Sequence, residues 1–195
     1  MKNLVFLIVF IGALIWFFLP ERANFNTGQV DFDIAPIQTA ASAGTFSFKG
    51  YTLTPLADFT VSARVLSKSI YRIDREAKLA PVDLVLGWQS MANLAVIDRI
   101  RISQSNRFYH WYTDNFPIPR NDIETQSANM HMIPSSDEIE NQLKALPNNV
   151  SVRLTGFLVS ITAADGWNWR SSMTRSDTGH GACEVFYVTG IVVGK

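Results

Sequence analysis

The stretch that most constrains the fold is residues 150–187, which contains the clearest pair of strands in the chain. Residues 150–155 alternate apolar and polar side chains, which is the period of a strand with one buried face. Gly156 interrupts the alternation, and a glycine within a strand permits a bend, so the strand can continue through residues 157–161. Asp165-Gly166 then supplies a tight turn. The pattern predicts a bent strand and a returning partner.

Two earlier segments show the same alternation, residues 46–63 and residues 99–102. Between them, residues 80–98 have a helical or irregular pattern, in which Gly87 weakens any long helix. The order of elements is therefore strands, a mixed segment, strands, a short helix and closing strands.

The short helix is predicted after residue 134. Ser135 and Glu138 have the spacing of a capping box, in which each side chain satisfies a free backbone N–H at the start of a helix. Ile139, Leu143 and Leu146 then recur at spacings that form one apolar stripe. We expect this helix to pack against the sheet.

The length of the chain predicts a single main domain, and its balanced charge predicts no strong overall electrostatic field. The chain has 195 residues, of which 47% are hydrophobic, enough for one domain with a core. Lysine and arginine equal aspartate and glutamate at 17 each, so no net charge attracts nucleic acid or an anionic surface. The one cysteine excludes an internal disulfide and a multi-cysteine zinc site.

The N-terminal residues predict a membrane anchor. Residues 4–19 carry no charge, and as a helix they would span about 24 Å of a hydrocarbon core of roughly 30 Å. Lys2 precedes this run, so the N-terminus would stay inside the cytoplasm. A cleaved signal is the alternative, but the best candidate for the cleavage site, Ala23, has Glu21 two places ahead of it, where a small residue is needed. A lipoprotein is excluded because no cysteine follows the run.

These observations divide the chain into three parts. Residues 1–20 are predicted to be the transmembrane anchor, residues 21–44 a tether, and residues 45–195 the β-rich domain outside the cytoplasm. Within the tether, the alternating Val30, Phe32 and Ile34 offer a short additional strand. The predicted location is the bacterial inner membrane, with the C-terminal domain in the periplasm or outside the cell.

Several motifs carry a resemblance to known proteins. The passage from SANMHMIP through the capped helix into VSVRLTGFLVSI resembles the helix-to-strand passage of small OB-type barrels. Over residues 46–190, the motifs FKGYTLTPLADF, PVDLVLGW, SANMHMIP and DTGHGACE resemble an uncharacterised family of single-span bacterial envelope proteins. That resemblance implies a bacterial source and a membrane tether, and it supplies no function.

The expected fold class is accordingly α+β and β-rich. We expect a small antiparallel barrel or a strongly bent, OB-like sheet with one or two short helices, preceded by one N-terminal transmembrane helix.

One candidate site is catalytic. A cysteine becomes a nucleophile when a neighbouring base or cation stabilises its thiolate, so Cys183 could act with His180 or His131. The HGAC order resembles the cysteine loop of envelope L,D-transpeptidases, although Ala182 intervenes here. The alternative is that Cys183 is a small apolar residue at the start of a core strand. The histidines do not have the spacing of a metal site, and no cofactor is expected.

The other candidate site is a binding surface of aromatic, basic and glycine-loop residues. Aromatic rings can stack on sugar rings or side chains, arginine can hold carboxylates, and a glycine-rich loop can present backbone N–H groups. The alternative is that the rings fill the core and the arginines face solvent. The predicted ligand-binding residues are Arg107, Tyr109, Trp111, Trp167, Trp169, Arg170, Asp177, Thr178 and Gly179.

The sequence thus predicts a membrane-anchored, non-enzymatic binding or assembly module of the envelope. Its expected partners are the membrane and an envelope protein or a cell-wall glycan or peptide, and the expected location argues against nucleic acid. The alternative is a Cys183-dependent hydrolase or transferase acting on envelope peptides or acyl groups.

Overall fold

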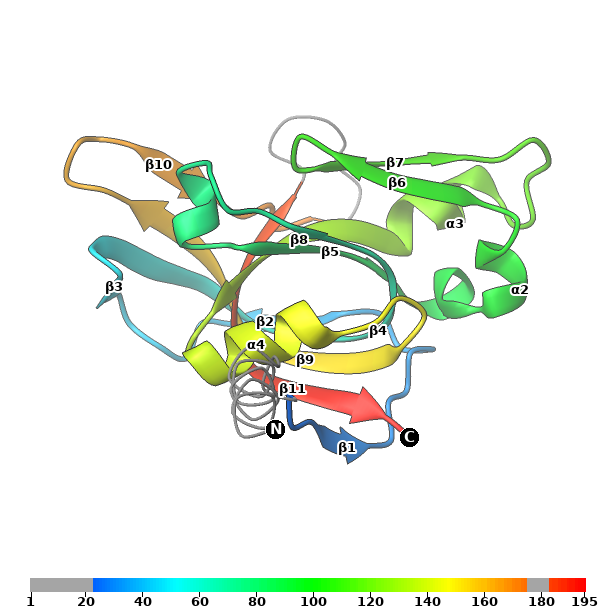
Figure 1. The fold of residues 1–195 in the computed structure, drawn as a ribbon, viewed down its shortest axis with the longest axis horizontal. Helices are drawn as coiled ribbons and strands as arrows, with labels where there is room; N and C mark the ends of the chain where they lie inside the picture. The colour runs from blue at the N-terminus through cyan, green and yellow to red at the C-terminus, as the bar shows by residue number, and fades with distance from the viewer. Residues whose placement is uncertain (1–22, 175–182) are drawn as a thin grey trace, which may run out of the picture.

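The computed structural model describes residues 23–174 and 183–195. Within these residues, nine strands form one sheet, two further strands form a separate hairpin, and the helices are few and short (Figure 1). The elements are β1 (Asn26–Gly28), β2 (Ile37–Ala40), β3 (Phe46–Phe48), β4 (Tyr51–Ile70), η1 (Glu76–Lys78), β5 (Val82–Gly87), η2 (Gln89–Ala92), α2 (Leu94–Ile97), β6 (Arg101–Ser105), β7 (Phe108–Tyr112), α3 (Arg120–Thr125), β8 (Ser127–Pro134), α4 (Asp137–Ala145), β9 (Ser151–Thr162), β10 (Asn168–Arg170) and β11 (Glu184–Gly194).

The long strand β4 organises the sheet because it pairs with β5 along one edge and with β9 along the other. The pairings continue from β5 to β8, from β8 to β11, and from β11 to β9, so they return to β4. The side chains enclosed by these five strands are apolar and form the largest core cluster. Its members include Val61, Leu84, Met130, Leu154 and Phe186.

Helix α4 adds its apolar stripe to this core. Leu143 and Leu146 are fully buried in the cluster, as the helical spacing predicts. The helix begins one residue later than predicted, since the hydroxyl of Ser136 accepts the hydrogen bond from the backbone N–H of Ile139 at 3.3 Å.

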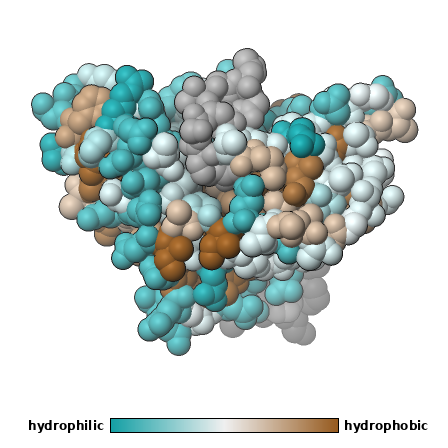
Figure 2. Space-filling model, turned by 180° about the vertical axis from the view of Figure 1, so that it is seen from behind, coloured by the Kyte–Doolittle hydropathy of each residue, from teal (hydrophilic) through white to brown (hydrophobic). Residues whose placement is uncertain are grey.

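The other side of the molecule, seen from behind in Figure 2, shows apolar residues only in small patches among polar ones.

The prediction of a small antiparallel barrel is wrong, because the sheet is mixed. β11 runs parallel to β8, and β1 runs parallel to β11. Five strands in a closed order of neighbours cannot all alternate in direction, so one adjacent pair must be parallel, and that pair is β8 and β11. The described helices also outnumber the one or two expected.

The predicted transmembrane helix is not part of the described structure. Residues 4–19 lie outside the described residues. In residues 23–174 and 183–195, every helix is too short or too polar to cross a membrane.

The segment predicted to be a tether contributes two strands to the sheet. β1 pairs with β11, and β2 pairs with β4. The predicted strand at Val30, Phe32 and Ile34 is absent from this described segment, in which residues 30–34 are irregular. Three alternating residues do not suffice to predict a strand. A strand also needs a free sheet edge with which to pair, and the local pattern does not show whether one lies beside it.

The structure explains why a glycine stands within β9. Gly156 has φ +154°, and a Cβ atom there would clash with the carbonyl oxygen of Tyr187 on β11. The glycine therefore lets two strands approach where the sheet bends, and β9 continues without a break from residue 151 to residue 162.

We expect Gly156→Ala to lower the free energy of unfolding by about 3 kcal/mol, because it adds both backbone strain and a steric clash. Urea denaturation followed by circular dichroism measures this change. Gly44→Ala is the matched control, since a Cβ atom there meets nothing within 4 Å. Equal stabilities of the two variants would contradict this explanation.

Candidate functional site

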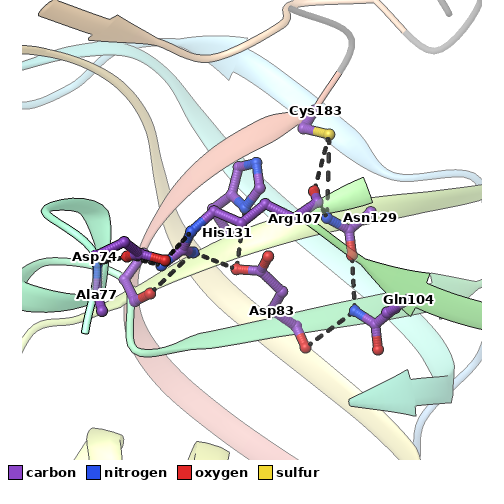
Figure 3. Close-up of polar contacts among 9 residues, drawn as sticks. Asp74, Ala77, Asp83, Gln104, Arg107, Asn129, His131 and Cys183 are labelled. Atoms are coloured by element: carbon purple, nitrogen blue, oxygen red, sulfur yellow. Dashed lines mark hydrogen bonds and ion pairs between the residues drawn. The ribbon is translucent and has the colours of Figure 1, made fainter. Parts of the chain in front are cut away.

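A group of charged and polar side chains lies under the tip of the β6–β7 hairpin, against the outer face of β5 and β8 (Figure 3). We call this group the buried polar cluster and define it as Asp83, Arg107, Asn129 and His131, which are buried or half-buried, together with Asp74, which is exposed at its edge. It brings together residues from four separate parts of the chain.

Arg107 occupies the two-residue turn between β6 and β7, where Ser105 pairs with Phe108. Both turn residues have positive φ, 50° at Asn106 and 66° at Arg107, as a type I′ turn requires. Arginine is an unusual residue for this position, which glycine or asparagine usually fills. The contacts of its side chain compensate for the cost of this conformation.

The guanidinium of Arg107 is only 13% exposed and donates to three groups. Nη1 donates to Asp83 Oδ1 at 3.0 Å and to the carbonyl oxygen of Ala80 at 3.2 Å. Nη2 donates to Asp74 Oδ1 at 2.7 Å. The hydrogen bond from Arg107 lowers the pKa of Asp74 below its ordinary value of 3.8. The face of the guanidinium lies 4.1 Å from the ring centre of Tyr71.

Asp83 is the centre of the cluster. It is completely buried, and its Oδ1 lies 3.0 Å from Arg107 Nη1 and 3.0 Å from Nδ1 of the buried His131. A buried carboxylate costs several kcal/mol unless positive charge and hydrogen bonds compensate for it. Arg107 supplies that charge, so the cluster fixes the hairpin tip to the sheet.

Asn129 connects the cluster to the cysteine. Its Nδ2 donates to the backbone oxygen of Arg107 at 2.9 Å and lies 4.0 Å from Cys183 Sγ. Its Oδ1 accepts from Gln104 Nε2 at 2.9 Å. The sulfur of Cys183 also lies 3.9 Å from the backbone oxygen of Arg107. The half-buried Cys183 therefore lies beside the cluster.

The β9–β10 hairpin covers the cluster with aromatic rings. The ring of Trp169 lies 4.8 Å from that of His131 and 6.1 Å from that of Trp167. Trp167 in turn contacts Arg75 at 4.6 Å, and Arg75 donates to both carboxylate oxygens of Asp165. Arg75, Trp167 and Trp169 therefore form a chain of contacts that ends at His131.

A different group of aromatic residues lines an open groove beside β7, with a volume of about 480 Å³. Tyr112 and Phe116 are 54% and 52% exposed there. Their rings are held in place: Tyr112 donates to Asp114 at 2.6 Å, and Phe116 contacts Trp111 edge-to-face at 6.0 Å. We call this the aromatic groove; it is lined by Tyr109, His110, Trp111, Tyr112, Thr113, Phe116, Arg120 and Glu124.

The structure separates the predicted site residues into two groups. Arg107, His131, Trp169 and Cys183 meet at the buried polar cluster, with Trp167 beside it. Tyr109 and Trp111 line the aromatic groove.

The remaining predicted residues join neither group in the described structure. Arg170 is exposed on β10. His180, Asp177, Thr178 and Gly179 lie outside the described residues.

Sequence reasoning missed Asp74, Asp83 and Asn129. A signal existed for Asp83, because it is the only charged residue in the apolar run PVDLVLGW, where a lone carboxylate needs a buried partner. Among residues 23–174 and 183–195, no three His, Cys, Asp or Glu side chains are grouped so that they could hold a metal ion.

Comparisons with known proteins identify no relative. No protein-family model matches the chain, and neither the curated proteins nor the solved structures contain a match.

We expect Arg107→Ala to destabilise the protein by about 3–5 kcal/mol, because it leaves the carboxylate of Asp83 buried without its cation. Urea denaturation measures the loss. Alanine and arginine are both disfavoured at positive φ, so the turn itself contributes little to the difference.

The control for this variant is Arg101→Ala on β6, whose side chain is 81% exposed and should contribute less than about 1 kcal/mol. A loss at Arg107 as small as that at Arg101 would show that the cluster does not fix the hairpin.

The ion pair at the β9–β10 turn predicts a dependence of stability on pH. The hydrogen bonds from Arg75 lower the pKa of Asp165 to about 2, from an ordinary value of 3.8. A lowered pKa in the folded state means that this stabilisation is complete above about pH 4 and is lost as the pH falls towards 2.

Thermal denaturation of wild type and Asp165→Asn between these pH values tests the prediction. The difference in stability between them should shrink as the pH falls. A difference that is constant with pH would exclude this cause.

Proposed function

We propose that this protein is a binding module that holds an envelope ligand in the aromatic groove. The observation that carries the proposal is the pair of rings, Tyr112 and Phe116, that are more than half exposed in one wall of the groove. Large exposed aromatic side chains gathered in a concave surface are typical of recognition sites.

The groove is suited to binding because its rings are already ordered. Arg101 lies over Tyr112 at 5.4 Å, and Arg120 lies over Trp111 at 5.7 Å. Rings fixed in this way lose little conformational freedom when a ligand binds, which favours affinity. At the β9–β10 hairpin, Trp167 and Trp169 are half-buried, so they offer a ligand less ring surface than Tyr112 and Phe116.

The proposed ligands are fragments of the cell wall or a segment of an envelope protein. Aromatic rings can stack on the apolar faces of sugars, and Arg120 and Glu124 at the groove wall can bind polar groups. Binding by these residues requires no chemical step. The location in the bacterial envelope stays a prediction from residues 1–22.

A titration with soluble muropeptides, which contain both sugar and peptide, tests this function. We expect saturable shifts in the NMR signals of Trp111 and a loss of affinity of about tenfold or more in Tyr112→Ala or Phe116→Ala. Both side chains are exposed, so these variants should remain folded.

Trp167→Ala is the control, because this ring belongs to the other hairpin. Affinity that falls in the control and not in the groove variants would place the ligand elsewhere. Absence of any shift would refute muropeptides as the ligand.

A further inference from the structure

Three neighbouring strands place four chemically reactive or polar side chains on one face. Asp83 on β5 pairs with His131 on β8, and His131 pairs with Val185 on β11. Alternate residues of a strand share a face, so Asn129 lies on the same side as His131. Cys183 directly precedes β11, and its sulfur lies 4.0 Å from Asn129 Nδ2, on this same side of the sheet. Figure 3 shows the ring of His131 between Asp83 and Cys183.

The position of Asp83 determines how His131 can act. Its Oδ1 lies 3.0 Å from Nδ1, so Nε2 is the ring nitrogen directed away from the carboxylate. The two atoms are within ion-pair distance without forming a hydrogen bond, so the carboxylate can compensate positive charge on the ring when Nε2 accepts a proton. Arg107 fixes the carboxylate in turn.

Asn129 supplies a donor beside the sulfur. Its amide nitrogen has two N–H groups. One donates to the backbone oxygen of Arg107 at 2.9 Å, and the same nitrogen lies 4.0 Å from Cys183 Sγ. A side-chain amide beside a nucleophile can stabilise the negative oxygen that forms when a carbonyl group is attacked.

We propose that Cys183, His131, Asp83 and Asn129 form a second functional site, which transfers acyl groups from esters or thioesters through a covalent intermediate on Cys183. His131 takes the proton from the thiol, and the sulfur attacks the carbonyl carbon. The bond to the leaving group then breaks, and the leaving group receives the proton from His131. Water, deprotonated by His131, attacks the thioester, which releases the acid and restores the thiol.

The site goes beyond the binding function proposed above, because it shares no residue with the aromatic groove. A purely structural cluster would need only Arg107 and Asp83 to fix the hairpin. His131 is a second buried polar group beside the same carboxylate, and burying it costs free energy that fixing the hairpin does not require. Such arrangements are frequent at catalytic sites.

The experiment uses the full-length protein and two probes, iodoacetamide and p-nitrophenyl acetate, with intact-mass detection. At about pH 6.5, native Cys183 should be alkylated about tenfold faster than in denaturant, because the native site stabilises the thiolate. p-Nitrophenyl acetate should give a burst of one equivalent of nitrophenolate, with an acetyl group on Cys183, followed by slower turnover as water hydrolyses the thioester. Cys183→Ser should abolish both.

Variants separate the roles of the residues. His131→Gln should slow acetylation by about 100-fold, because it removes the group that takes the proton from the thiol. Asn129→Ala should slow acetylation by about 100-fold while alkylation changes little, because only the carbonyl attack needs its donor.

A native thiol that reacts no faster than the denatured one, or that is acetylated equally fast in His131→Gln, would overturn the proposal. The wild-type comparison remains decisive if a variant fails to fold. Muropeptide binding to Cys183→Ser separates this result from the function of the aromatic groove, since loss of the thiol leaves that groove intact.

Discussion

The contact between Arg107 and Asp83 is the interaction on which the arrangement of both candidate sites depends. It joins the tip of the β6–β7 hairpin to strand β5. The guanidinium of Arg107 compensates the negative charge of the buried Asp83. The same hairpin carries the aromatic groove at its open end, where Tyr112 and Asp114 lie. At its tip, the backbone oxygen of Arg107 orients Asn129 beside Cys183. One ion pair thus lies on the hairpin that carries the aromatic groove and next to the residue that contacts the thiol.

The protein uses arginine and aromatic side chains in two different ways. Where a guanidinium is paired with carboxylates and covered by rings, as at Arg75 and Arg107, the contact fixes two parts of the chain together. Arg101 and Arg120 are also paired, with Asp114 and Glu124, but they are far more exposed, and the rings that they cover line the open aromatic groove. Composition does not distinguish these uses, because they differ in how exposed each guanidinium is in the folded chain.

Local features of the fold could be predicted from the sequence, and long-range ones could not. The strand through Gly156 and the apolar stripe of α4 follow from periods that a few residues reveal. The parallel pairing of β8 with β11 depends on how distant strands meet, which no local pattern records. The candidate sites divide in the same way. Aromatic and cysteine residues stand out by type, whereas the partnership of Asp83 with His131 appears only when β5 and β8 are paired.

β11 completes the ring of strand pairings, and this affects how the chain folds while it is being synthesised. Residues 184–194 form β11, which pairs with both β8 and β9, so these two strands keep unpaired backbone groups until residues 184–194 have left the ribosome. Open strand edges can pair with other chains, which is a common route to aggregation. A nascent chain that stalls before residue 184 therefore exposes two open strand edges at once, and either of them can pair with another chain.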